Sequence, residues 1–316
     1  MLLRTEYKSK KEQILIQPND KILAIGSCFA DEMSKNFQSH NWNILTNPHG
    51  ILFNPASILT CIQDIENSKI YTNKEIFNWE GLFRSFNHHG AFSATNIDTF
   101  LAQINDSISQ ARTFAQNANW CIISLGTAWV YRYLSTNEIV ANCHKIQQSS
   151  FQHELLPSSL IESMLKSMVD ALLSLNPEMR IIFTVSPVRY LKDGFVENSR
   201  SKAHLLHALH QVLDNNPEVK YFPSFEIFLD DLRDYRFVAE DLVHPNKLAI
   251  DYIWEKFIET YFSSDSMAYA KEMKKWYSMK NHRILHAETD AHKDFIKKLE
   301  NYTEELKSKY PFAVFV

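Results

Sequence analysis

The stretch KILAIGSCFADEM, residues 21–33, passes from a short apolar run to a helical pattern within one Gly-Ser step. Residues 21–26 have the length and composition of a buried strand, and the residues after Ser27 are typical of a helix. A serine at such a boundary has two interpretations. It caps the helix by accepting an N–H bond, or it presents a nucleophilic hydroxyl at a helix N-terminus, where negative charge is favoured. The sequence has no G-x-S-x-G motif, so this serine is not the nucleophile elbow of the α/β-hydrolases.

Five short apolar runs recur along the chain and are predicted as strands: Lys21–Gly26, Trp42–Thr46, Trp120–Leu125, Arg180–Val185 and Val219–Phe222. Between most of them, apolar residues repeat at three- and four-residue spacing, as helices require. This alternation predicts an α/β fold with a mainly parallel sheet that helices cover on both faces. Gly26, Gly50 and Gly126 fall at or just after strands, where open α/β sheets bind their ligands.

Two regions depart from this alternation. Residues 67–92 are rich in aromatic, Asn and His side chains and are expected to form an irregular insertion. From residue 263 the chain becomes charged and keeps a helical pattern, and these charges are expected to be solvated. We therefore predict one domain over residues 1–262, with the insertion at about 67–92, and a helical C-terminal extension over residues 263–316.

The composition indicates a globular protein, with 45% hydrophobic and 13% aromatic residues. A net charge of −4, from 33 basic and 37 acidic residues, indicates no surface for nucleic acid or an anionic membrane. The four cysteines have no C-x-x-C spacing, which argues against a zinc or redox site. Two of them lie beside or inside apolar strand-like runs, where we expect buried, reduced thiols. The sequence shows no signal peptide and no apolar stretch of transmembrane length, and we expect a soluble, cytoplasmic protein.

A serine nucleophile needs a base, and the base needs an acceptor that orients it. The sequence AEDLVHPN, residues 239–246, places Asp241 and His244 three residues apart before a predicted helix. That spacing lets the carboxylate bind one imidazole nitrogen while the other nitrogen faces outward. With 13 histidines in the chain, D-x-x-H alone is a weak signal. Together with Gly-Ser at the end of the first strand, it predicts a Ser-His-Asp centre.

Other residues offer alternatives. Cys28 could act as the nucleophile, although we expect it to point into the sheet–helix interface as a buried thiol. His88 and His89 could join Asp241 and His244 in a metal site, but a histidine that contacts the substrate is the simpler interpretation. Arg189 follows a predicted strand and could bind an anionic group, although a salt bridge to nearby carboxylates is the more common outcome.

Several motifs together resemble one known family. IGSCFAD, residues 25–31, looks like the signature of the GSCFA domain family, which is itself similar to the SGNH (GDSL-like) hydrolases. Further matches are NPHGILFNP (47–55), LGTAWVY (125–131), VANCHK (140–145), TVSPVR (184–189) and EDLVHP (240–245). The resemblance covers roughly residues 20–260. It implies a flavodoxin-like three-layer α/β/α sandwich, a five-stranded parallel sheet in the order 2-1-3-4-5, and a Ser-His-Asp centre for ester hydrolysis or acyl transfer.

On this resemblance, Ser27 takes the position of the nucleophile, and His244 and Asp241 take those of the base and its partner. Gly50 fits the glycine whose backbone N–H joins that of Ser27 in the oxyanion hole. The third motif departs from the family pattern, because Ala128 stands where SGNH enzymes carry an asparagine whose amide binds the oxyanion.

Loss of one oxyanion donor typically lowers the rate by about two to three orders of magnitude. We therefore expect another residue to replace the missing asparagine. Asn142 and His144 are the first candidates, because a hairpin after the third strand could return them to the site. His89 is the next candidate, and a polar turn is the alternative interpretation of Asn142 and His144.

The predicted function is a serine esterase that acts on an acyl ester, with an acetyl or carbohydrate ester as a candidate, and that needs no cofactor or metal. An acyltransferase with the same triad is one alternative, and a non-catalytic carbohydrate-binding module is the other. The expected partner is a small-molecule or carbohydrate ester, with no nucleic acid and no membrane. The sequence gives no indication of the oligomeric state.

Overall fold

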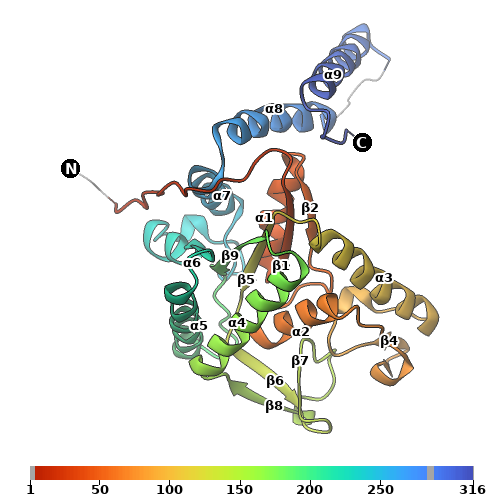
Figure 1. The fold of residues 1–316 in the computed structure, drawn as a ribbon, viewed down its shortest axis with the longest axis vertical. Helices are drawn as coiled ribbons and strands as arrows, with labels where there is room; N and C mark the ends of the chain where they lie inside the picture. The colour runs from red at the N-terminus through yellow and green to blue at the C-terminus, as the bar shows by residue number, and fades with distance from the viewer. Residues whose placement is uncertain (1–3, 283–287, 316) are drawn as a thin grey trace.

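The computed structural model describes residues 4–282 and 288–315, which are built around a five-stranded parallel sheet (Figure 1). The sheet has the order β2-β1-β5-β9-β10. Its strands are β1 (Lys21–Gly26), β2 (Asn43–Thr46), β5 (Trp120–Leu125), β9 (Arg180–Val185) and β10 (Lys220–Phe222). In chain order these are strands 2-1-3-4-5, so the α/β fold, the parallel sheet and its order are confirmed.

Alternate residues of the three central strands face two separate hydrophobic cores. One core contains Leu23, Ile25, Cys121, Ile123, Ile181 and Phe183, and the other contains Ile22, Trp120, Ile122 and Ile182. Successive side chains of a strand point to opposite faces, so a strand that is apolar throughout must be covered on both sides. This explains why the strands appear in the sequence as continuous apolar runs.

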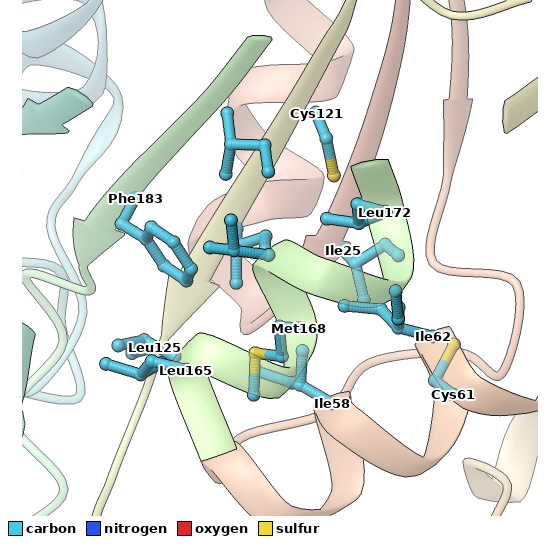
Figure 2. Packing of buried hydrophobic residues seen from close by; sticks show 14 of the residues in the cluster. Ile25, Ile58, Cys61, Ile62, Cys121, Leu125, Leu165, Met168, Leu172 and Phe183 are labelled. Atoms are coloured by element: carbon cyan, nitrogen blue, oxygen red, sulfur yellow. The ribbon is translucent and has the colours of Figure 1, made fainter. Parts of the chain in front are cut away.

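Helices supply both covers, which gives the three layers of the fold. The first core is closed by α2 (Pro55–Glu66), α3 (Ile97–Ala115), α4 (Ser158–Leu175) and α5 (Phe195–Asn215). Figure 2 shows Ile25, Leu125 and Phe183 of the sheet close to side chains of α2 and α4. The second core is closed by α1 (Cys28–Ser39), α7 (Lys247–Tyr261) and α8 (Ser264–Lys280).

A small antiparallel sheet follows β5 and extends beyond the parallel sheet (Figure 1). Its order is β7-β6-β8, with β6 (Trp129–Tyr133), β7 (Glu138–Val140) and β8 (Phe151–Leu155). The two ends of this unit meet, because the Leu156 N–H donates to the Ala128 carbonyl oxygen at 3.0 Å. The hairpin expected over residues 129–140 is present as β6 and β7, whereas β8 was not predicted.

The expected insertion consists of short elements and contains the hairpin β3 (Phe77–Trp79) and β4 (Leu82–Arg84), with 3₁₀ turns at Asn73–Glu75 and Gly90–Phe92. After β10 come α6 (Ser224–Glu226), a π turn at Ile227–Asp231 and a 3₁₀ turn at Tyr235–Phe237. Among the described residues, no helix has both the length and the apolar character that crossing a bilayer requires.

The expected C-terminal extension forms α8 and α9 (Asp290–Lys309), which lie at one end of the molecule in Figure 1. The Tyr269 ring of α8 packs edge-on against Trp42 with centroids 4.8 Å apart, so α8 is part of the second core. α9 is attached to α8, where Trp276 Nε1 donates to Thr303 Oγ1 at 2.9 Å.

The junction between β1 and α1 depends on Gly26. Its φ is +135°, and a Cβ at this position would lie 2.2 Å from the Ser124 carbonyl oxygen of β5. The same carbonyl accepts the Ser27 N–H at 3.0 Å. Only glycine tolerates this backbone conformation together with so close an approach, so β1 can pass into α1 directly beside β5.

We predict that Gly26→Ala destabilises the protein by about 3 kcal/mol or more, because it combines backbone strain with a backbone clash. Gly81→Ala is the matched control. Gly81 also has a positive φ, of +76°, but a Cβ there meets no atom within 4 Å. The Gly81→Ala substitution should therefore lower the free energy of unfolding by only about 1 kcal/mol. Urea unfolding of both variants measures the difference, and equal losses would contradict the role given to the Ser124 contact.

Candidate functional site

A cavity of about 640 Å³ lies at the carboxyl ends of the central strands. Its wall combines residues that follow β1, β5 and β9 with residues of the β6–β8 sheet and of the loop before α7. Ser27, His89, Asn142 and His244 all line it, although they are far apart in the sequence. Ligands of open α/β sheets bind at this edge, so the cavity is the candidate site.

Ser27 is the N-cap of α1 and also lines the cavity, so its role as a cap leaves the second interpretation open. Its Oγ accepts the Phe29 N–H at 3.3 Å and shares a 2.7 Å hydrogen bond with Ser124 Oγ. The side chain is almost completely buried. The structure therefore holds the hydroxyl in a defined position at the N-terminus of α1.

Asp241 and His244 are in direct contact on the loop before α7. Asp241 Oδ2 lies 2.6 Å from His244 Nδ1, and Oδ1 accepts the N–H groups of His244 at 3.0 Å and Val243 at 2.9 Å. These two backbone bonds, followed by the bond to the imidazole, lower the pKa of Asp241 to about 2. The ionised carboxylate holds the hydrogen on Nδ1, which leaves Nε2 as the proton acceptor. Within the described chain, no hydrogen bond joins His244 to Ser27.

The two backbone amides expected in the oxyanion hole are engaged elsewhere. The Ser27 N–H donates to Ser124 O at 3.0 Å, and the Gly50 N–H donates to Asn47 O at 2.7 Å. Each N–H serves one strong acceptor, so neither is free to bind an oxyanion in this conformation. Gly50 has a packing role, because a Cβ on it would lie 2.3 Å from the His89 Cβ. Its lack of a side chain lets His89 approach the cavity.

The structure separates the three candidates for the replacement donor. His144 does not line the cavity, because its ring is buried and its Nε2 is bonded to Ser85 O at 2.8 Å. Asn142 lines the cavity, and its Oδ1 accepts the His144 N–H at 2.8 Å. Its Nδ2 makes no hydrogen bond within the described residues. His89 also lines the cavity, and its Nδ1 accepts the Ala91 N–H at 3.3 Å, so the hydrogen of the neutral ring is on Nε2.

Two further donors were missed by the sequence reasoning. The Cys28 N–H is the first amide of α1, and no acceptor for it occurs in the part of the chain that the structure describes. Asn54 lines the cavity, and its Oδ1 caps α2 through the Ser57 N–H at 2.9 Å, which leaves Nδ2 unbonded within the same residues. The sequence signal for Asn54 was its place before Pro55, which is typical of a helix N-cap.

Two expectations about neighbouring residues are corrected. Cys28 lines the cavity instead of pointing into the interface, because it is the first residue of α1 at the edge of the sheet. Burial raises the pKa of its thiol, which disfavours the reactive thiolate. Arg189 does not line this cavity, and it forms no salt bridge within the described residues. Its backbone N–H donates to Val243 O at 3.4 Å, and its guanidinium donates to Leu242 O at 3.5 Å.

A buried lysine lies beneath the site. Lys202 of α5 donates from Nζ to Gly126 O and Ser186 O, each at 2.7 Å. Both acceptors line the cavity at the ends of β5 and β9. Burial lowers the pKa of Lys202 to about 7. The side chain therefore ties together two loops that form the wall of the cavity.

Behind the His89 segment lies a pair of buried histidines. The His49 and His88 rings are 4.2 Å apart, and none of their nitrogens has a hydrogen-bond partner among the described residues. Burial lowers the pKa of His49 to about 4 and holds the pKa of His88 well below its usual value. His49 Nε2 lies 3.6 Å from Asp64 Oδ2, but with a neutral ring at pH 7 this contact is not an ion pair. In the described chain, no group of three or more His, Cys, Asp or Glu residues is arranged to hold a metal ion.

Comparison with known proteins identifies the family of this chain. The sequence model of the GSCFA family matches residues 21–257, which contain Ser27, Asp241 and His244. The chain belongs to the GSCFA family. The match ends within α7, so α8 and α9 lie outside the part that defines the family. A search of curated proteins finds no match.

Solved structures with a similar fold are esterases and related proteins. An acetylxylan esterase from Geobacillus stearothermophilus is 11% identical, with a TM-score of 0.42 and coverage of 79% of this GSCFA chain and 98% of that chain. A protein assigned as an acylhydrolase from Bacteroides fragilis NCTC 9343 is 10% identical, with a TM-score of 0.39 and coverage of 82% and 92%. At these identities, the function has to be argued from the site itself.

We predict that the histidine pair makes this GSCFA protein sensitive to acid. The native rings stay neutral below pH 6.5, whereas the unfolded rings take up protons near their usual pKa. The unfolded state thus binds more protons between about pH 6.5 and 4, and stability falls as the pH falls through this window. His88→Phe should reduce the loss between pH 7 and pH 5 by about 2 kcal/mol.

Urea unfolding at the two pH values measures this effect. His207→Asn is the control, because His207 is exposed on α5, and it should leave the loss of stability on acidification unchanged. If His88→Phe and the wild type lost equal stability on acidification, the buried pair would not be the source of the sensitivity.

Proposed function

We propose that the protein is a serine esterase. The observation that carries this proposal is the shared cavity of Ser27 and a histidine whose Nδ1 is held by a carboxylate. A nucleophile, a base and an orienting acceptor then lie in one site, which is the arrangement that acyl transfer through serine requires.

In the proposed reaction, Ser27 Oγ attacks the ester carbonyl while His244 Nε2 takes the hydroxyl proton. The tetrahedral intermediate expels the alcohol, which leaves with that proton, and an acyl-serine remains. Water then attacks the acyl-serine, and His244 takes a proton from this water. His244 passes that proton to Ser27 Oγ as the bond between Oγ and the acyl carbon breaks, and the carboxylic acid is released. Ser27 must exchange its bond to Ser124 for one to His244, and catalytic hydrogen bonds often tighten only when the substrate is bound.

The oxyanion is proposed to be bound by the Cys28 N–H and by Asn142 Nδ2. The Cys28 amide adjoins the nucleophile at the positive end of α1. Asn142 brings a side-chain amide to the cavity, as the missing asparagine of the third motif would. His89 Nε2 is a second side-chain donor on the same wall.

An acyltransferase is the second candidate, because the same acyl-serine could be transferred to an alcohol instead of water. A non-catalytic carbohydrate-binding module is the third candidate. The contact between Asp241 and His244 disfavours it, since binding alone needs no oriented base.

We predict that Ser27→Ala and His244→Ala each lower kcat for a 4-nitrophenyl ester by about 10³-fold or more, and that Asp241→Asn lowers it by a similar factor. Ser27→Ala should also abolish labelling by a fluorophosphonate. Ser199→Ala, at an exposed serine of α5, is the control and should retain both properties.

Three results would contradict this assignment. Full activity of Ser27→Ala would exclude this serine as the nucleophile, and loss of labelling in Cys28→Ala but not in Ser27→Ala would assign the reaction to the thiol. The absence of both hydrolysis and labelling in the wild type would favour the binding module.

The oxyanion assignment predicts the effect of Asn142→Asp. Aspartate keeps the oxygen that accepts the His144 N–H, but it removes the Nδ2 donor. We expect kcat to fall by about 10²-fold with a smaller change in KM, because the bond strengthens mainly in the transition state. Asn54→Asp, which preserves the cap of α2, is the comparison. If only Asn54→Asp reduced kcat, Asn54 would be the donor.

A further inference from the structure

The cavity is much larger than an acetyl group requires. Cavities of about 300–1,000 Å³ hold drug-sized ligands, and this one has about 640 Å³. An acetyl group has three heavy atoms and fills on the order of 100 Å³, judged from the ~30 Å³ share of a water molecule. Most of the space is therefore available to the remainder of the substrate.

The charge of the cavity differs from that of the chain. The chain has a net charge of −4, yet no Asp or Glu occurs among the described residues that line the cavity. The wall instead contains two lysines, Lys145 and Lys192. Asp193 and Asp241 contact two histidines of the wall, His153 and His244, and do not themselves line the cavity.

Both lysines have N–H groups to offer a ligand. Lys192 Nζ donates to Tyr131 Oη at 2.9 Å, which leaves two of its three hydrogens. Lys145 Nζ has neither a hydrogen bond nor an ion pair within the described residues. An anion that entered this cavity would meet two cations and no competing carboxylate on the wall.

Lys192 lies along the β6–β8 sheet, which contributes apolar side chains to the wall of the cavity. Tyr131 is two residues further along β6 than Trp129, about 7 Å, and β6 leads away from the end of β5. Lys192 is bonded to Tyr131, the middle residue of this strand. Along this sheet, the wall contains aromatic and branched side chains, among them Trp129, Val140 and Phe151.

We propose that the substrate is an ester with an apolar body and an anionic group, of which a carboxylate is the simplest, remote from the scissile bond. The apolar body packs against the β6–β8 sheet, and Lys145 and Lys192 bind the anion. This inference rests on the proposed function, since it names the substrate class of the same site. It replaces the expected acetyl ester by a larger and charged substrate.

Matched ester pairs test the proposal on the intact protein. On the acyl side, the 4-nitrophenyl monoester of suberic acid is compared with 4-nitrophenyl octanoate. On the alcohol side, 3-carboxyphenyl butyrate is compared with 3-carbamoylphenyl butyrate. For at least one pair, the wild type should show about tenfold higher kcat/KM for the anion, because an exposed ion pair contributes up to roughly a fivefold factor and two lysines are present.

Lysine variants identify the source of the preference. Lys145→Met and Lys192→Met should each reduce the ratio of anionic to neutral kcat/KM by about three- to fivefold, mainly through KM. Added salt should reduce the wild-type ratio as well. Lys166→Met is the control, because Lys166 lies on α4 and pairs with Glu162 at 2.6 Å. It should leave the ratio unchanged.

The outcomes separate the two proposals. Hydrolysis of neutral esters with a ratio near one for both pairs would overturn the anionic substrate class and leave the esterase in place. A ratio that neither lysine variant changes would overturn the assignment of the anion site. If none of the four esters were hydrolysed faster than by Ser27→Ala, both the esterase and the inference would be overturned.

Discussion

The close approach of β1 and β5 at Gly26 is the constraint on which the rest of the site depends. With no side chain at Gly26, the backbone of β1 can turn beside the Ser124 carbonyl, and the same carbonyl holds the Ser27 N–H. This contact fixes the start of α1, and with it the cap, the orientation of the Ser27 hydroxyl and the free first amide of the helix. The contact that positions the proposed nucleophile also uses the Ser27 amide, which was expected to bind an oxyanion.

The sequence predicted the features that depend on local patterns. It did not predict those that depend on contacts between segments far apart in the chain. Strands buried on both faces are continuous apolar runs, so the sheet followed from the sequence pattern, and its order followed with the help of the family resemblance. Asp241 and His244 are three residues apart, so their contact forms within one loop. Residues 151–155 have a mixed composition and become a strand only by pairing with β6. The engagement of the Gly50 N–H and the burial of Lys202 depend on neighbours that no local pattern reveals.

Scaffold and specificity occupy different parts of the chain. The proposed nucleophile is attached to the parallel sheet, whose strands are fixed by two cores. Many of the residues that shape the cavity lie on the antiparallel sheet and on the loop after β9. Lys192 of that loop is bonded to Tyr131 of the sheet and so connects the two. Lys202 adds a second connection beneath the cavity, because it joins the ends of β5 and β9. The position of the reacting group and the shape of the pocket are thus determined by separate sets of contacts.

The antiparallel unit leaves the fold after Ala128 and returns at Leu156, and one backbone hydrogen bond joins these two residues. A segment whose ends are adjacent can be exchanged without moving the strands that flank it, as in domain insertion. Residues 129–155 therefore form a segment that can be replaced as a unit. A related chain could acquire a different pocket by exchange of this segment between its two adjacent ends, while its central sheet and the proposed nucleophile stayed in place.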